Sequence, residues 1–325
     1  MSREAAKGGA LSAARARHLG ALLDGLAART DAATRIGYDP VELPRRYADP
    51  ADAEVAGLIA SCLAYGRADL FKPVVERILA AMGESPARFS ERFAEAPDRD
   101  AFAFAVYRFN RPADVRALVA AIGHARREHG SLGARFAKLF REEGGGPGAL
   151  RAALARFARE LREAPPVASL LRGRGGRGLL HLLPDAGGAG ACKRLNLYLR
   201  WMVRGPDRVD LGLWRGIPAS ALLIPLDTHL HRIGALLGLT ARGDASWRTA
   251  EEITAGLRAI DPADPVRFDF ALCHLGMSGE CPARREPGRC EVCGLATACG
   301  ALRGARGPRR GAARRGGRSA RAGRS

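Results

Sequence analysis

The sequence predicts an all-α protein, and three observations carry this prediction. Apolar residues recur at intervals of three and four along most of the chain, as they do on one face of a helix, rather than alternating. The chain lacks runs of β-branched residues that would build a sheet. Hydrophobic residues make up 47% of the 325 positions and aromatic residues only 6%, so we expect a sizeable core built mainly from Leu, Ala, Val and Ile.

The periodic segments give the expected helices in order. They lie at 10–28, 51–65, 69–82, 112–128, 131–142, 147–162, 189–204, 228–238, 246–259 and 265–275. Glycine and proline interrupt helices, and they mark breaks at Pro165-Pro166, the glycines between 173 and 190, Gly205-Pro206, Gly243-Asp244 and Asp261-Pro262. We therefore predict a helical body over 1–276, a cysteine loop over 277–300 and a tail over 301–325.

The net charge of +18 is concentrated at the carboxyl end. Residues 301–325 contain nine arginines, six glycines and no acidic residue, so half of the net charge lies there and we expect this segment to be disordered. A basic body with a basic arm indicates a polyanionic partner, most simply nucleic acid. The alternative for the tail alone is a solvated segment that binds nothing.

The expected location is the cytoplasm. No apolar run approaches the roughly 20 residues that a membrane-spanning helix needs. The start MSREAAKGGALSAARARH lacks the apolar core and cleavage site of a secretory signal. We expect a nucleoid-associated monomer without a membrane partner, in a compartment where structural disulfides are rare.

Four of the seven cysteines lie in the stretch CPARREPGRCEVCGLATAC. They follow the spacing C-x8-C-x2-C-x5-C and are Cys281, Cys290, Cys293 and Cys299. Four thiolates on one compact loop suit either a four-iron four-sulfur cluster or zinc, and the spacing leaves both open. The remaining cysteines lie in apolar helical contexts and are expected to be buried structural thiols: Cys62, Cys192 and Cys273.

Only four of the 52 basic side chains are lysines. Arginine keeps its proton, whereas lysine can form a Schiff base. In a chain that otherwise uses arginine, a lysine therefore marks a position that needs an amine. Lys193 follows the glycine-rich turn GGAGAC at the start of a helix, where backbone N–H groups bind phosphates well. The polar face expected for this helix consists of Lys193, Asn196, Arg200 and Arg204. The alternative for Lys193 alone is an ordinary surface lysine.

Asp227 stands directly before the amphipathic helix in LLIPLDTHLHRIGALLGL, where an aspartate caps the first turn. A capping carboxylate can also serve catalysis. His229 and His231 add polar, basic groups at this helix start, and as metal ligands they would lack an evident third partner.

A glycine pattern near the middle of the chain does not indicate a nucleotide cofactor. Gly173, Gly175 and Gly178 fit G-x-G-x-x-G, but a dinucleotide site needs a preceding strand and an acidic residue about 20 positions later. Neither is present at the required place.

Together these segments resemble the helix-hairpin-helix DNA glycosylases, the superfamily of endonuclease III. GGAGACK resembles the hairpin that leads to the family's lysine, PLDTH its V-D-T-H segment, and CPARREPGRCEVCGLATAC its cluster loop. VAGLIASCLAYGRAD resembles, more loosely, the early helix and damage-probing loop. DPVELPRRYADPADAEVAGLIASCLAYGR, CKRLNLYLRWMVR, LGLW and IPLDTHLHRIG further resemble a largely uncharacterised bacterial family of such relatives.

The resemblance implies a two-lobed helical fold, with the hairpin and catalytic helix at about 183–204 and a four-iron four-sulfur cluster on the cysteine loop. It implies a DNA repair glycosylase with abasic-site lyase activity, in which Lys193 forms the Schiff base and Asp227 assists it. The implied partner is double-stranded DNA with damaged bases or abasic sites. The residues expected at the DNA are Tyr65, Arg67, Gly188, Gly190, Arg194, Arg200, His229 and His231.

Two departures from endonuclease III bear on this expectation. The interval from Lys193 to Asp227 is longer, although the archaeal 8-oxoguanine glycosylases are similar in having a long interval. The probing loop also lacks a glutamine, so lesion preference does not transfer. Two other classes of function stay open: a DNA-binding protein of the same fold without the chemistry, and a zinc-bearing RNA-binding protein.

Overall fold

The computed structural model describes residues 11–146, 148–172 and 176–303, and the regular structure of these residues is helical. This confirms the all-α prediction. The α-helices are α1 (Ala13–Arg29), α2 (Ala32–Ile36), α3 (Pro50–Leu63), α4 (Ala68–Ala81), α5 (Pro86–Glu95), α6 (Pro112–His129), α7 (Leu132–Glu142), α8 (Ala149–Glu163), α9 (Pro165–Leu170), α10 (Arg177–Leu182), α11 (Lys193–Val203), α12 (Thr228–Leu236), α13 (Trp247–Arg258), α14 (Asp269–Met277), α15 (Pro287–Cys290) and α16 (Gly300–Arg303). Short 3-10 helices are η1 (Pro40–Glu42), η2 (Pro44–Arg46) and η3 (Ala219–Ala221).

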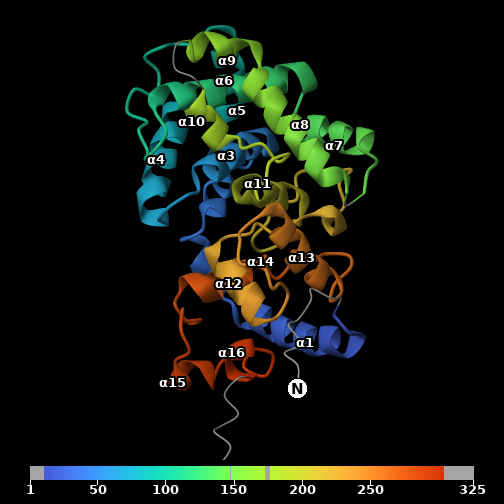
Figure 1. Ribbon diagram of the computed structural model, residues 1–325. Coiled ribbons are helices and arrows are strands. Elements are labelled where there is room, and N and C mark those ends of the chain that lie inside the picture. The colour runs from blue at the N-terminus through green and yellow to red at the C-terminus, as the bar shows by residue number, and fades with distance from the viewer. Residues whose placement is uncertain (1–10, 147, 173–175, 304–325) are drawn as a thin grey trace, which may run out of the picture.

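Two groups of helices lie at opposite ends of the molecule (Figure 1). Helices α3 to α10 gather at one end, and α1 and α12 to α16 gather at the other. Helix α11 lies between them. Its Tyr198 hydroxyl donates to Glu54 of α3, and its Arg200 pairs with Asp269 of α14.

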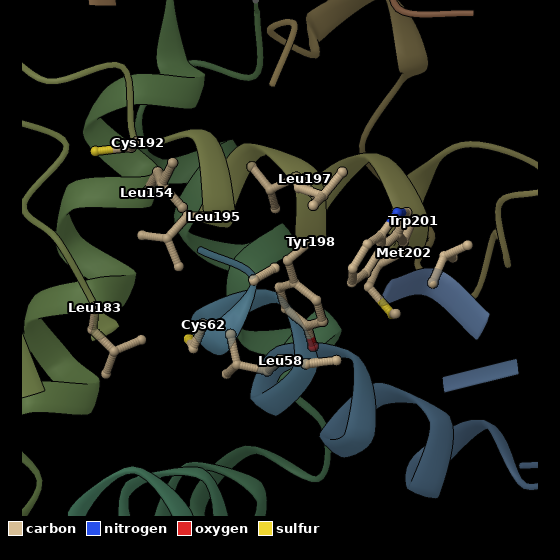
Figure 2. Close-up of a cluster of buried hydrophobic side chains, with 14 of the residues drawn as sticks. Leu58, Cys62, Leu154, Leu183, Cys192, Leu195, Leu197, Tyr198, Trp201 and Met202 are labelled. Atoms are coloured by element: carbon tan, nitrogen blue, oxygen red, sulfur yellow. The ribbon is translucent and has the colours of Figure 1, made fainter. Parts of the chain in front are cut away.

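Helix α11 is the central helix of the core, and it packs across α3. Figure 2 shows the Tyr198 side chain directed from α11 toward α3, where its hydroxyl donates to the Glu54 carbonyl at 3.1 Å. Gly57 makes this close crossing possible, because a Cβ there would lie 2.6 Å from Cε of Met202. Trp201 and Met202 are fully buried in the same layer.

The polar face expected for α11 is therefore not a surface. Asn196 is 1% exposed, and its Nδ2 donates to the Ala191 carbonyl at 3.0 Å. Helix α11 also begins at Lys193 rather than at 189, because Cys192 has a positive φ of 47° that interrupts the helical path. The side-chain periodicity alone could not reveal this local change of backbone.

Several short helices were not predicted. Helix α9 begins at Pro165-Pro166 instead of breaking there, because proline fits the first helical turn, where no backbone donor is needed. Helix α10 lies within the glycine-rich break, and helix α5 begins at Pro86.

Some predictions fall outside the part of the chain that the structure describes. These concern Gly173 and Gly175 of the glycine pattern, and residues 304–325 of the basic tail. Among the described helices, none combines the length and the apolar character that crossing a membrane requires.

Candidate active site

Lys193 is the first residue of α11, and a well-anchored turn leads to it. The Arg151 guanidinium donates to carbonyls of this turn, including that of Gly188 at 2.8 Å. The backbone N–H of Trp247 donates to another turn carbonyl at 3.0 Å, and Arg151 lies over the Trp247 ring at 5.2 Å. These contacts hold the turn by its carbonyls, while Gly188 and Gly190 remain exposed at the surface.

Asp227 caps α12, as the sequence predicted. Its carboxylate accepts a hydrogen bond from the Leu230 N–H at 2.8 Å. Leu230 and Ile233 are buried and fix the rotation of α12 against the core. The carboxylate is therefore positioned by a packed helix rather than by a mobile loop.

The fold brings Lys193 and Asp227 together. The distance from Lys193 Nζ to Asp227 Oδ2 is 3.5 Å, and the two side chains are 34% and 14% exposed. Burial by itself would lower the pKa of Lys193, but the Asp227 charge and other nearby acidic groups outweigh burial and raise that pKa above its ordinary value. The resting amine is therefore protonated at neutral pH, partly accessible, and close to a group that can accept its proton.

Cys273 of α14 is a third member of this site, which sequence reasoning missed. It was expected to be a buried structural thiol, but it is only partly buried and its Sγ lies 3.7 Å from Asp227 Oδ2. Burial and the Asp227 charge raise the pKa of this thiol well above its ordinary value, so the thiol keeps its proton and donates to the carboxylate. Only the crossing of α12 and α14 reveals this contact, and no motif signals it.

Tight packing maintains that crossing. Gly276 of α14 faces the start of α12, where a Cβ at this position would lie 2.6 Å from Cβ of His229. A side chain at 276 would therefore push α12 and its capping Asp227 away from α14.

Arg200 does not lie at a DNA-binding surface, so that prediction is wrong. It is 2% exposed, and its guanidinium pairs with Asp210 at 3.0 Å and with Asp269. Burial by itself would lower the pKa of Arg200, but Asp210 and Asp269 raise it and keep the group charged. Arg200 therefore joins α11 to α14 inside the core, because a buried guanidinium needs carboxylate partners.

Tyr65 and Arg194 also make internal contacts. Arg194 donates to the Cys62 carbonyl at 2.6 Å and to the His181 carbonyl, and its guanidinium lies 5.1 Å from the Tyr65 ring centre. The Tyr65 hydroxyl lies 2.6 Å from Asn110 Oδ1, and burial raises the pKa of Tyr65 to about 12. Tyr65 is thus held in place and is not free to enter a DNA stack.

The other predicted DNA contacts differ in their surroundings. Arg67 is highly exposed and pairs with Asp69 at 2.6 Å. His231 Nε2 lies 2.8 Å from the Arg242 carbonyl oxygen, so this ring is tied to the backbone. His229 is partly exposed at the start of α12, beside Asp227.

The four loop cysteines surround one space. Cys281, Cys290, Cys293 and Cys299 all contribute to the wall of a cavity of about 120 Å³. The wall is otherwise largely apolar and includes Leu236, Leu237 and Leu275. Residues far apart on the loop therefore line the same cavity.

Hydrogen-bond donors already point at these sulfurs. Arg232 of α12 donates to Cys281 Sγ at 3.3 Å, and the Glu286 N–H donates to Cys290 Sγ at 3.4 Å. Such donors stabilise thiolates, and they adjust the properties of a metal group that the thiolates bind. Within the described residues, no three His, Cys, Asp or Glu side chains converge closely enough to hold a single metal ion.

The site and the helical fold define a class of protein with a lysine–aspartate pair on two core helices and a cysteine loop beside them. The chain belongs to the family described as "Protein of unknown function (DUF2400)", whose model matches residues 39–278. The matched region includes Lys193, Asp227 and Cys273 and ends before Cys281. Neither the curated proteins nor the solved structures gave a match to the chain.

Proposed function

We propose that this protein is a DNA glycosylase and abasic-site lyase of the helix-hairpin-helix class, which acts in the cytoplasm on nucleoid DNA. The observation that carries the proposal is the 3.5 Å approach of Lys193 to Asp227. These two residues belong to separate sequence segments, and their convergence at the starts of α11 and α12 supports a common chemical role.

The reaction begins with proton transfer. Lys193 is protonated at rest, so it must lose a proton before it can act as a nucleophile, and Asp227 is placed to accept it. The neutral amine then attacks C1′ of the deoxyribose, and the bond from C1′ to the damaged base breaks. The base departs with the bonding electron pair and takes up a proton.

The second stage forms the Schiff base and cleaves the strand. The sugar ring opens as the C1′–O4′ bond breaks, O4′ is protonated, and an iminium joins Lys193 to C1′. Loss of a C2′ proton then expels the 3′ phosphate by β-elimination. Asp227 remains close enough to offset the positive charge that develops on the sugar and the iminium.

Two exposed features of the described surface suit a polyanion. Gly188 and Gly190 form an exposed turn directly before Lys193, and Arg67 is exposed at the start of α4. Flipping a damaged nucleotide out of the duplex costs a few kcal/mol, and it costs least where the base is already mispaired or missing. The proposed partner is therefore double-stranded DNA with damaged bases or abasic sites.

For the cysteine loop we propose a four-iron four-sulfur cluster, with zinc as the alternative. Cys281, Cys290, Cys293 and Cys299 would hold it, and the shared cavity with its sulfur-directed donors supports this ligand set. The cluster would supply a rigid scaffold for residues 281–299 beside α12.

Borohydride trapping tests the function. The protein is incubated with duplexes that carry an abasic site, 8-oxoguanine, uracil or an oxidised pyrimidine, and is then reduced. We expect a covalent protein–DNA adduct with the wild type and none with Lys193→Ala. Lys138→Ala is the matched control, because Lys138 is exposed on α7 and should leave the adduct unchanged.

Two results would contradict the proposal. One is an adduct that persists in Lys193→Ala, because the Schiff base would then form elsewhere. The other is tight binding of these duplexes without adduct or base release on any substrate, which would show a DNA-binding protein without the chemistry.

A further inference from the structure

An exposed aromatic side chain stands at the tip of a tight turn between α5 and α6. Tyr107 and Asn110 exchange backbone hydrogen bonds at 3.1 and 2.9 Å, and Arg108 between them has a positive φ of 51°. Phe109 follows in this turn and is 66% exposed. A large exposed ring on a strained turn is not explained by core packing.

Hydrogen bonds to Tyr65 and to α10 hold this turn in place. The Tyr107 hydroxyl donates to the Tyr65 carbonyl at 2.5 Å, and the Tyr65 hydroxyl donates to Asn110 Oδ1 at 2.6 Å. The Asn110 side-chain amide donates to the Gly178 carbonyl of α10 at 2.8 Å. Because these bonds fix the turn, Phe109 is displayed to solvent in one orientation with little entropy left to lose on binding.

Aromatic rings support Phe109 on one side. Its ring lies 6.4 Å from the Tyr65 ring at an interplanar angle of 15°, and 5.4 Å from the His181 ring. Burial, together with Arg194 and Arg108, lowers the pKa of His181, so this ring is neutral at physiological pH. The result is a stack of Phe109 on Tyr65, with the uncharged His181 ring edge-on to both, in which Phe109 is largely exposed.

Cationic groups surround this stack. The Arg108 guanidinium lies 5.8 Å from the Phe109 ring centre, and Arg67 is exposed on the neighbouring loop. The loops approach closely, since a Cβ at Gly66 would lie 2.6 Å from Arg108 Nη1. Among nearby acidic groups, Asp69 pairs with Arg67, and the Asp114 carboxylate accepts from the Arg111 N–H at 2.8 Å. Aromatic rings interleaved with arginines are the surface that binds unpaired nucleobases.

The ring stack is connected to the candidate active site. Arg194 directly follows Lys193, and its guanidinium lies against the Tyr65 ring on which Phe109 stacks. A nucleic acid with a backbone at Lys193 would therefore have bases within reach of this turn.

We infer that Phe109 is a base-stacking residue, which lies against an unpaired nucleobase when the protein holds DNA with a missing or displaced base. The inference rests on nucleic acid being the partner in the proposed function, but it does not depend on the Lys193 chemistry. Phe109 takes the place of Tyr65 as the expected aromatic contact to DNA, because the hydroxyl and the ring of Tyr65 both make contacts inside the protein.

Equilibrium binding to two duplexes of one sequence tests the inference. One duplex is fully paired, and the other has a stable abasic-site analogue that leaves the opposite base unpaired. We expect Phe109→Ala to weaken binding to the abasic duplex about tenfold and binding to the paired duplex less than twofold, since stacking of one base on an aromatic ring supports a change of this order.

The matched control is Tyr38→Ala. Tyr38 is 68% exposed, so this change removes a comparable exposed ring outside the turn, and both affinities should stay unchanged. Phe109→Trp provides a second readout, because Trp201, Trp214 and Trp247 are buried. Fluorescence of the new tryptophan should be quenched by the abasic duplex, and its affinity should match that of the wild type.

Three outcomes would overturn the inference. Phe109→Ala could bind the abasic duplex as tightly as the wild type, or lose affinity equally for both duplexes. It could also abolish self-association in sedimentation while DNA binding persists, which would make the ring a contact between copies of this chain. If the wild type traps DNA but Phe109→Ala shows no change in binding, only this inference fails. If the wild type binds neither duplex, the proposed function fails with it.

Discussion

At the residue scale, the charge state of Lys193 depends on its neighbour Asp227. A nucleophilic amine must be neutral, yet the Asp227 carboxylate at 3.5 Å favours the ammonium and raises the pKa of Lys193. In the proposed reaction the same carboxylate removes the proton. Asp227 therefore has opposite effects on the ground-state charge of Lys193 and on its activation, and the two effects separate experimentally.

The Asp227→Asn variant separates these two effects of Asp227 when the rate of adduct formation is measured as a function of pH. Asparagine also caps helices well, so α12 should be retained. Removing the charge lowers the pKa of Lys193, so the rising limb of the profile should move to lower pH. The plateau should fall by about 100-fold because the amide accepts no proton. Asp227→Glu should keep the limb near its original position.

A limb that stays in place in Asp227→Asn would contradict the expected electrostatic coupling. A plateau that stays unchanged would instead show that another group removes the proton. Both interpretations require that the variant is folded, which circular dichroism spectra equal to those of the wild type would show.

At the scale of elements, a buried carboxylate ties α3 to the region of α6 and α7. Glu54 accepts from the Arg126 guanidinium at 2.7 Å, from the Gly133 N–H at 2.8 Å and from Trp214 Nε1 at 2.8 Å. It thereby satisfies a helix start, a buried cation and a buried indole at once. Each of these donors would lose a partner if the carboxylate were absent.

Glu54→Gln is expected to destabilise the fold by about 3 kcal/mol, because it leaves the Arg126 charge without its buried partner. Urea unfolding followed by circular dichroism measures the change. Glu91→Gln is the matched control, since Glu91 pairs with the same Arg126 at 3.0 Å but is 33% exposed. Its cost should be below about 1 kcal/mol. Equal costs for both variants would show that burial of Glu54 is not what matters.

At the scale of the whole molecule, the cysteine loop closes over the end formed by α1 and α12. The His18 ring nitrogen lies 3.1 Å from Thr297 Oγ1, and Arg15 donates to the Leu237 carbonyl at 2.7 Å. Arg232 reaches Cys281 from the same helix that Asp227 caps. A group bound by the cysteines would therefore brace the helix that positions the Asp227 carboxylate.

Metal analysis of anaerobically purified protein tests this arrangement. We expect a brown protein that contains iron and sulfide, and a colourless protein with one zinc would contradict the cluster. Cys293→Ser should lower the iron content and the melting temperature, whereas Cys62→Ser should leave the iron content unchanged, because Cys62 is fully buried beside α11.

The sequence by itself determined the helical class, the order of the main helices and the pairing of Asp227 with the start of α12. These follow from local rules, since helix periodicity and capping depend on residues a few positions apart. Tertiary structure decided which polar groups reach solvent. Arg200 has the charge of a phosphate ligand, but α11 crosses the core and Asp210 and Asp269 enclose it. Cys273 beside Asp227 and the exposed ring of Phe109 likewise depend on how distant segments pack, which no local pattern encodes.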